Sequence, residues 1–147
     1  MRIMFVCTGN TCRSPMAEAL LKQKAAQIEV KSYGISAFPG SEMSQGAKEA
    51  LKEKGIEVTH KANNLSEEAL EWATLVLTMT EAHKQMIVSY YPHMKEKVFT
   101  LKEYANGERG NVNDPFGGSL SVYRDTLQEI EALVDQVIEK LQKRSDA

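Results

Sequence analysis

The sequence predicts an α/β fold, a small doubly wound three-layer sandwich in which helices cover both faces of a four-stranded parallel sheet. Short runs that are apolar throughout, such as 75–79, are typical of buried parallel strands. Segments with apolar residues at three- and four-residue spacing alternate with these runs, as in repeated strand–helix units. A length of 147 residues is enough for one domain with its own core, so a single domain over 1–147 is expected.

Strands and helices are expected to alternate in chain order. The expected ranges are strand 3–6, helix 15–28, strand 30–35, helix 44–55, a short helix from 66, strand 75–79, helix 80–90, strand 98–101 and helix 119–140. The first helix can begin with the Ser14 hydroxyl as its N-cap and Pro15 at its first position, where a missing N–H costs nothing. Gly55 is a C-terminal cap of the second helix, and Pro92 stops the fourth. The last helix carries a broad apolar stripe, and the polar residues 141–147 after it are expected to fray.

The loop between the first strand and the first helix, Cys-Thr-Gly-Asn-Thr-Cys-Arg-Ser over 7–14, predicts an anion site. Unpaired backbone N–H groups and the positive end of a helix dipole surround one small volume there. The spacing Cys-x5-Arg places the Cys7 sulfur at the base of this volume, and the planar fork of Arg13 suits two phosphate oxygens. The amides, Arg13 and the Ser14 hydroxyl would stabilise a thiolate. We therefore predict a cysteine nucleophile that attacks phosphorus.

Two observations separate this loop from other cysteine and phosphate sites. Gly9 and Asn10 are residue types that tolerate the left-handed backbone that a closed loop needs. The loop lacks the Gly-Lys-Ser/Thr ending of an NTPase P-loop, so nucleotide and magnesium are not implied. A lone cysteine after a strand is usually a packing residue, but Arg and Ser at this spacing before a helix favour catalysis.

The chain has only two cysteines, Cys7 and Cys12, which are too few for a disulfide scaffold. No His or further Cys lies near enough in sequence to complete a tetrahedral metal site, and we expect neither a metal nor another cofactor. Two interpretations of Cys12 stay open. It is either a small buried packing residue or a partner that forms a reversible disulfide with Cys7 and spares the nucleophile from higher oxidation.

The composition limits the possible partners. A formal net charge of −2 argues against a general nucleic-acid or membrane-surface binder. The apolar run near the N-terminus is too short for a signal peptide or a membrane span, so a cytoplasmic protein is expected. A monomer is the default expectation.

A polar, Gly-rich loop over 111–119, Asn-Val-Asn-Asp-Pro-Phe-Gly-Gly-Ser, is the second candidate element. Attack on a phosphoryl group leaves a basic atom that must be protonated, and Asp114 offers a carboxyl group. Pro115 restricts Asp114 to extended backbone and stiffens the loop. Taken alone, an Asp-Pro pair is only a common turn.

Three further residues have two interpretations each. The loop over 38–44 should return to the same sheet edge, where Phe38 either lines a cleft or packs in the core. His60 is expected to fix a turn by hydrogen bonding rather than to take part in chemistry. His83, in the first turn of the helix over 80–90, could face the cleft, but a solvated side chain is favoured.

The loop over 7–14, with Pro-Met-Ala behind it, resembles the signature of the low-molecular-weight protein-tyrosine-phosphatase family. Matches at Asp114-Pro115 and over 75–79 extend the resemblance over nearly the whole chain. The resemblance implies the strand order 2-1-3-4 and the roles of nucleophile for Cys7, phosphate-binding arginine for Arg13 and general acid for Asp114. A cysteinyl-phosphate would form and be hydrolysed without a cofactor.

The same resemblance implies which residues surround the phosphate. Ser14 would steady the thiolate, and Asn10 would shape the loop. The expected phosphate- and substrate-binding residues are Thr8, Gly9, Asn10, Thr11, Cys12, Ser14 and Phe116.

Two positions resemble the protein arginine phosphatase branch of the family, found in Gram-positive bacteria. Tyrosine-specific members usually carry a larger apolar residue at the position of Thr11 and often Tyr at that of Phe116. A short polar Thr11 is compatible with a guanidine, Asp114 can accept its N–H groups, and Phe116 can stack on its plane. The resemblance thus implies phosphorylated proteins as substrates, with phosphoarginine favoured. The alternative is a tyrosine phosphatase in which Thr11 is a neutral variant.

Two other classes fit the sequence less well. Arsenate reductases of this fold need additional redox cysteines downstream, and the chain has none after Cys12. A phosphate-binding module without catalysis would not need both a cysteine nucleophile and a remote acid.

Overall fold

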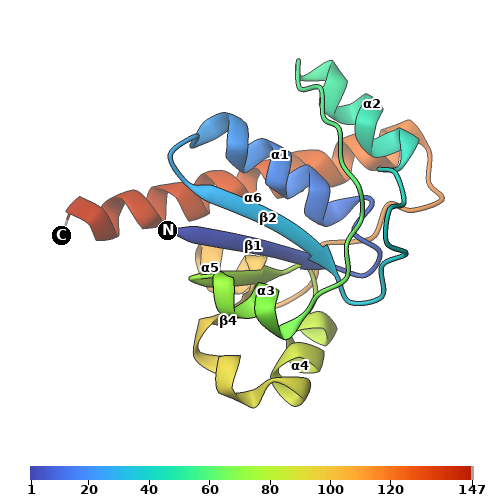
Figure 1. Ribbon diagram of the computed structural model, residues 1–147. Coiled ribbons are helices and arrows are strands. Elements are labelled where there is room, and N and C mark those ends of the chain that lie inside the picture. The colour runs from blue at the N-terminus through green and yellow to red at the C-terminus, as the bar shows by residue number, and fades with distance from the viewer. Residues whose placement is uncertain (147) are drawn as a thin grey trace.

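Four parallel strands form the central sheet of the computed structural model, which describes the backbone of residues 1–146 and the side chains of residues 1–144 (Figure 1). The strands are β1 (Arg2–Cys7), β2 (Glu29–Gly34), β3 (Leu75–Thr78) and β4 (Val98–Thr100). Their order is β2-β1-β3-β4, with β1 paired to both β2 and β3. The predicted parallel sheet and its order 2-1-3-4 are confirmed.

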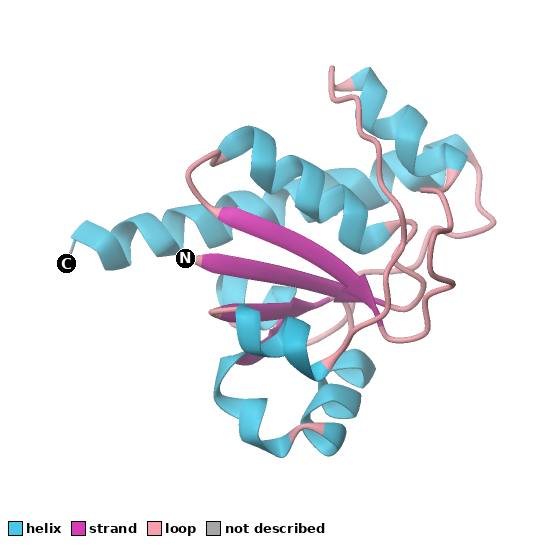
Figure 2. Ribbon diagram, in the orientation of Figure 1, coloured by secondary structure: helices cyan, strands magenta, loops and turns pink. Residues whose placement is uncertain are grey.

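Helices cover both faces of this sheet (Figure 2). They are α1 (Arg13–Lys24), α2 (Gln45–Glu53), α3 (Glu67–Trp72), α4 (Glu81–Tyr90), the 3-10 helix η1 (Pro92–Lys97), α5 (Leu101–Asn106) and α6 (Leu120–Asp146). The core on one face joins the sheet to α1, α2, α5 and α6, and the core on the other joins it to α3, α4 and η1. The predicted three-layer sandwich is therefore confirmed.

The central strand β1 is buried on both faces, which explains its unbroken apolar sequence. Ile3 and Phe5 point into the core under α1 and α6, and Met4 and Val6 point into the core under α3 and α4. Successive side chains of a strand alternate between faces, so a strand covered on both sides needs apolar residues at every position. The edge strand β2 instead alternates between buried and exposed residues.

The boundaries of α1 and α6 differ from the expected ones. α1 begins at Arg13, with Cys12 at its N-cap and no side-chain cap, so the predicted capping role of Ser14 is wrong. α6 is continuous to Asp146, where fraying from 141 was expected; residue 147 lies outside the described residues. Side chains late in α6 contact α5, because Lys140 Nζ and Arg144 Nη1 donate to the backbone oxygen and the hydroxyl of Tyr104 at 3.1 and 3.2 Å.

Two short helices, η1 and α5, were not predicted. α5 begins with a capping box, in which the Thr100 hydroxyl accepts from the Glu103 N–H at 3.0 Å and the Glu103 carboxylate accepts from the Thr100 N–H at 3.2 Å. The sequence signal, Thr-x-x-Glu, was present at the end of the predicted fourth strand. The strand consequently ends at Thr100 rather than at 101.

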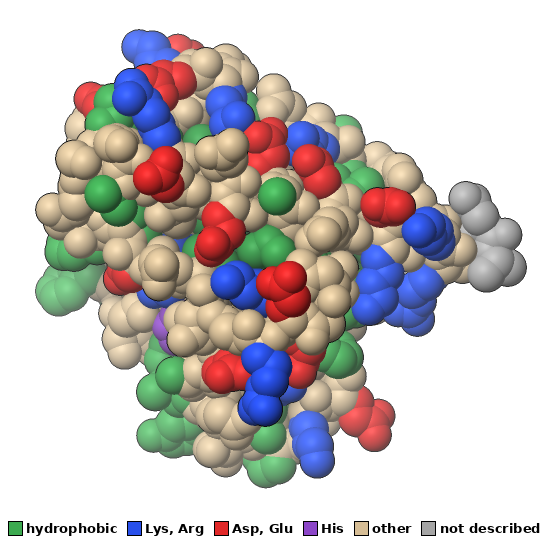
Figure 3. Space-filling view, turned by 180° about the vertical axis from the view of Figure 1, so that it is seen from behind, with side chains coloured by type: hydrophobic (Ala, Val, Ile, Leu, Met, Phe, Trp, Pro, Cys, Tyr) green, Lys and Arg blue, Asp and Glu red, His purple; other side chains and the backbone are tan. Residues whose placement is uncertain are grey.

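All four strands end at the same edge of the sheet, because they are parallel. The loops after β1, β2 and β3 meet there, on the right of Figure 1, while the N-terminus and the end of α6 lie on the opposite side. Acidic and basic side chains are interspersed on the face shown in Figure 3. Within the described residues, no helix is both long and apolar enough to cross a membrane.

Candidate active site

A hollow of about 220 Å³ lies at the edge of the sheet where β1 ends and α1 begins. It is lined by Cys7, Thr8, Gly9, Thr11, Cys12, Arg13, Asp114 and Phe116. The structure therefore brings the two loops singled out in the sequence into one cavity, although they are far apart along the chain. Asn10 and Ser14 are fully buried and support the loop from behind instead of lining the hollow.

The loop is held in shape by Asn10. It is the one non-glycine residue with positive φ in the described chain, at 57°, as its residue type allows; Gly9 does not adopt a positive φ. The Asn10 side chain donates to Ser14 Oγ at 2.9 Å and to Ser32 Oγ at 3.0 Å, and it accepts from the Asn63 N–H at 2.9 Å. This anchoring leaves the N–H groups of residues 8–12 without a backbone partner among the described residues.

The Cys7 sulfur receives support from the same network. Its Sγ lies 2.9 Å from Ser14 Oγ, and Ser14 Oγ already accepts a hydrogen bond from Asn10. The hydroxyl proton of Ser14 is thus available to Cys7 Sγ, and a hydrogen bond of this direction stabilises a thiolate. Ser32 in turn donates to Glu18 Oε1 at 2.6 Å, which sets the direction of the bonds around Asn10.

Gly34, the last residue of β2, lets the loop lie close to the sheet. A Cβ added to Gly34 would lie only 2.6 Å from the backbone oxygen of Thr8 and 3.1 Å from Asn10 Cβ. Gly34 was not among the residues predicted for the site. A glycine at the end of a predicted strand was the available signal, since it often marks a close approach of another backbone segment.

Arg13 is buried, and backbone of the second loop fixes its guanidinium. Its Nη1 donates to the backbone oxygen of Val112 at 2.9 Å, and its Nη2 lies 3.6 Å from Asp114 Oδ2. The second loop is itself tied to the sheet, because the Val112 N–H donates to the backbone oxygen of Met79 at 2.9 Å. Five N–H donors in a fixed plane allow Arg13 to hold these partners and still face an oxyanion.

Asp114 stands at the mouth of the hollow with its side chain 50% exposed. Its Oδ1 accepts from the Phe116 N–H at 3.1 Å, a local turn that orients the carboxylate. Phe116 is 73% exposed and lines the same hollow, so its ring is available to a bound molecule.

Phe38 is 83% exposed, so the interpretation of Phe38 as a core residue is wrong.

The two histidines near the loop differ from one another. His60 Nε2 forms a 2.9 Å hydrogen bond with the backbone oxygen of Asn10, which confirms its expected hydrogen-bonding role. The expected solvated side chain of His83 is wrong, because His83 is 7% exposed and its Nε2 lies 2.8 Å from Thr8 Oγ1. Burial, followed by the nearby charge of Arg13, lowers the pKa of His83 from 6.5 to about 4, while Asp114 acts in the opposite direction.

Acidification is expected to destabilise the folded protein through His83. The imidazole of the unfolded chain binds a proton below about pH 6.5, whereas the folded one stays neutral until about pH 4. The free energy of unfolding is therefore unaffected by protonation of His83 above pH 6.5, and it decreases by about 3 kcal/mol as the pH falls to 4. Urea unfolding of the wild type and of His83→Gln across this range measures it. If the difference in unfolding free energy between the wild type and His83→Gln does not change with pH, the lowered pKa of His83 is contradicted.

Cys12 lies next to the hollow but bonds away from Cys7. Its Sγ donates to Ser44 Oγ at 3.2 Å and lies 3.6 Å from the Tyr123 hydroxyl. Both cysteines are free and buried. These contacts agree with the packing interpretation of Cys12 and leave the disulfide interpretation a prediction.

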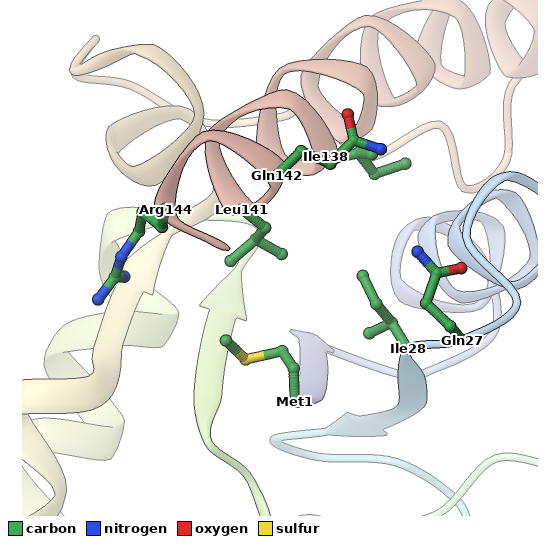
Figure 4. A pocket seen from close by; sticks show the side chains of 7 residues that line it. All are labelled: Met1, Gln27, Ile28, Ile138, Leu141, Gln142 and Arg144. Atoms are coloured by element: carbon green, nitrogen blue, oxygen red, sulfur yellow. The ribbon is translucent and has the colours of Figure 1, made fainter. Parts of the chain in front are cut away.

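A larger hollow, of about 780 Å³, lies at the other end of the sheet (Figure 4). Its lining residues are Met1, Gln27, Ile28, Ile138, Leu141, Gln142 and Arg144. None of these side chains is a nucleophile or a general acid near neutral pH, so this hollow offers no comparable chemistry. Among the described residues, no three His, Cys, Asp or Glu side chains gather as ligands for a metal ion.

The fold and the site together define a phosphatase of the cysteine-dependent, metal-independent class. A family model described as low molecular weight phosphotyrosine protein phosphatase matches residues 2–147, and the chain belongs to this family. This result confirms the family that the sequence predicts.

Particular relatives lie in the predicted branch of the family. The chain is 55% identical over 142 residues to a protein-arginine-phosphatase of Geobacillus stearothermophilus, with 96% of each chain covered. It is 50% identical over 147 residues to a protein-arginine-phosphatase of Bacillus subtilis, with 97% and 98% covered. A solved structure of a YwlE arginine phosphatase mutant with a phosphorylated active-site serine superposes with a TM-score of 0.95 at 49% identity, covering 97% of both chains.

Proposed function

We propose that the chain is a protein arginine phosphatase, which hydrolyses phosphoarginine in proteins through a cysteinyl-phosphate. The observation that carries the proposal is that Cys7, Arg13 and Asp114 share one hollow of about 220 Å³. Relatives named protein-arginine-phosphatase at 55% and 50% identity support the substrate.

The hollow has the donors that a phosphoryl group requires. The N–H groups of residues 8–12 have no backbone partner among the described residues, and Arg13 adds a planar cation. Charge-assisted hydrogen bonds from such donors stabilise the equatorial oxygens as negative charge develops in the transition state. Cys7 lies at the base of the same hollow, in place for attack on phosphorus.

The reaction has two displacement steps. The Cys7 thiolate forms a sulfur–phosphorus bond while the phosphorus–nitrogen bond breaks, and Asp114 transfers its proton to the departing guanidine. Asp114, now a carboxylate, takes a proton from a water molecule that attacks phosphorus. The sulfur–phosphorus bond then breaks, which releases inorganic phosphate and restores the thiolate.

Three residues at the mouth support a guanidine as the leaving group. Thr11 is short and polar, so it leaves room for a group that carries N–H donors. The exposed ring of Phe116 can stack on the guanidinium plane, and the Asp114 carboxylate can accept hydrogen bonds from its edge. Phosphorylated proteins are the partners in this proposal, in which the chain acts as a cytoplasmic monomer without nucleic acid.

A paired assay tests the proposed substrate. Two peptides of the same sequence, one carrying phosphoarginine and one phosphotyrosine, are offered to the purified protein and phosphate release is measured. We expect kcat/KM for the phosphoarginine peptide to exceed that for the phosphotyrosine peptide by at least about a hundredfold, because mismatched polar groups discriminate strongly. Equal rates or the reverse preference would remove the arginine assignment and indicate a tyrosine phosphatase.

A further inference from the structure

The Thr8 hydroxyl stands between the hollow and a buried histidine that the proposed reaction does not use. Thr8 is the first residue after β1 and lines the hollow. Its Oγ1 lies 2.8 Å from His83 Nε2 and 3.5 Å from Arg13 Nη2. A guanidinium can only donate, so Thr8 Oγ1 accepts from Arg13. The direction of the shorter bond, to His83, determines where the Thr8 proton points.

The surroundings of His83 decide that direction. Its Nδ1 is buried and has no hydrogen-bond partner among the described residues. A neutral imidazole carries one N–H, and placing it on Nδ1 would leave a buried donor without an acceptor. Placing it on Nε2 leaves only a lone pair unpaired, which costs less than an orphaned N–H. His83 therefore donates from Nε2 to Thr8 Oγ1.

We propose that His83 is a positioning residue, which by donating to Thr8 Oγ1 directs the Thr8 hydroxyl proton into the hollow, toward an oxygen of the bound phosphoryl group. With His83 and Arg13 both donating, the two lone pairs of Thr8 Oγ1 are used, and its proton is left for a ligand. The inference rests on the proposed phosphatase function and adds a side-chain donor to the backbone donors of the loop.

Inhibition by inorganic phosphate measures this donor. Thr8→Val keeps the shape of the side chain without its hydroxyl, and we expect the inhibition constant of phosphate to rise about tenfold, as for a lost hydrogen bond to a charged group. Thr8→Ser keeps the hydroxyl and should stay near the wild-type value. His83→Leu should raise the inhibition constant of phosphate as much as Thr8→Val does. The double variant Thr8→Val/His83→Leu should have the same inhibition constant as Thr8→Val alone, because both changes remove the same donor.

Two conservative variants at His83 form a matched pair. The amide nitrogen of Gln reaches the position of Nε2, whereas that of Asn reaches only the position of Nδ1. We expect the inhibition constant of phosphate to stay near the wild-type value in His83→Gln and to rise about tenfold in His83→Asn, while the two variants have similar melting temperatures. Equal losses in both variants, or additive losses in the double variant, would show that His83 acts on stability and not through Thr8.

Nitrogen NMR at pH 7 gives a second measurement, in which the tautomer of His83 is read from the wild-type protein itself. The two imidazole nitrogens of His83, assigned by comparison with His83→Gln, should show the Nε2–H tautomer. The Nδ1–H tautomer would overturn the proposal. Turnover that persists in Cys7→Ser would instead reject the proposed function, so the two failures are distinct.

Discussion

Replacing Cys7 by serine is expected to abolish phosphate release from a phosphoarginine peptide. The serine hydroxyl is not ionised near neutral pH, so the hydrogen bond from Ser14 has no anion to stabilise at position 7. Removing the nucleophile of a comparable catalytic unit costs on the order of 10⁴-fold or more in kcat. The measurement is kcat of Cys7→Ser against wild type, in the presence and absence of a metal chelator.

Binding and folding of the same variant provide the control. The N–H donors of the loop and Arg13 remain in Cys7→Ser, so inorganic phosphate should still bind, and the melting temperature should stay close to that of the wild type. A residual activity above about one per cent of wild type, or a chelator-sensitive activity, would reject the cysteinyl-phosphate mechanism.

Replacing Asp114 by asparagine is expected to lower kcat by about 10²- to 10³-fold, as for loss of a general acid–base group. The amide keeps the size of the side chain and can still accept from the Phe116 N–H, but it cannot protonate a guanidine or deprotonate water. KM should change little, because Arg13 and the loop amides still hold the phosphate. Steady-state kinetics on the phosphoarginine peptide measure both constants.

A second substrate, with a leaving group that needs no proton, tests whether Asp114→Asn loses only the general acid of the first step or its folded structure as well. With p-nitrophenyl phosphate, whose leaving group is a weak base that departs without a proton, Asp114→Asn should form the intermediate nearly normally and release a burst of p-nitrophenolate. Asp125→Asn changes an exposed aspartate on α6 and is the matched control. If Asp114→Asn and Asp125→Asn have equal kcat values, Asp114 is not the acid.

The features that follow from neighbouring residues were predictable. The strand, loop and helix over 3–24 form from local spacing, and the same residues carry Cys7 and Arg13 into one loop. The left-handed backbone of Asn10 follows from its residue type. The sheet order came from the family resemblance, because strand spacing alone does not order a sheet.

Features that depend on packing partners were predicted less well. Ser14 fits the rule for a helix cap, but Asn10 and Cys7 compete for its hydroxyl and determine its role. His83 was expected in solvent, yet the end of β1 places Thr8 against it. Gly34 was not identified, since its importance arises only where the loop crosses the end of β2.

The nucleophile loop and the alternation of strands and helices followed from the sequence alone, because each depends on residues a few positions apart. The motif of that loop, with the matches at Asp114-Pro115 and over 75–79, was enough to identify the family. The folded structure was needed to show that Asp114 and Cys7 line one hollow, that Ser14 bonds to the Cys7 sulfur and that a buried His83 bonds to Thr8. These pairs form because parallel strands end at a common edge, where packing brings together side chains whose separation along the chain carries no information about their distance in space.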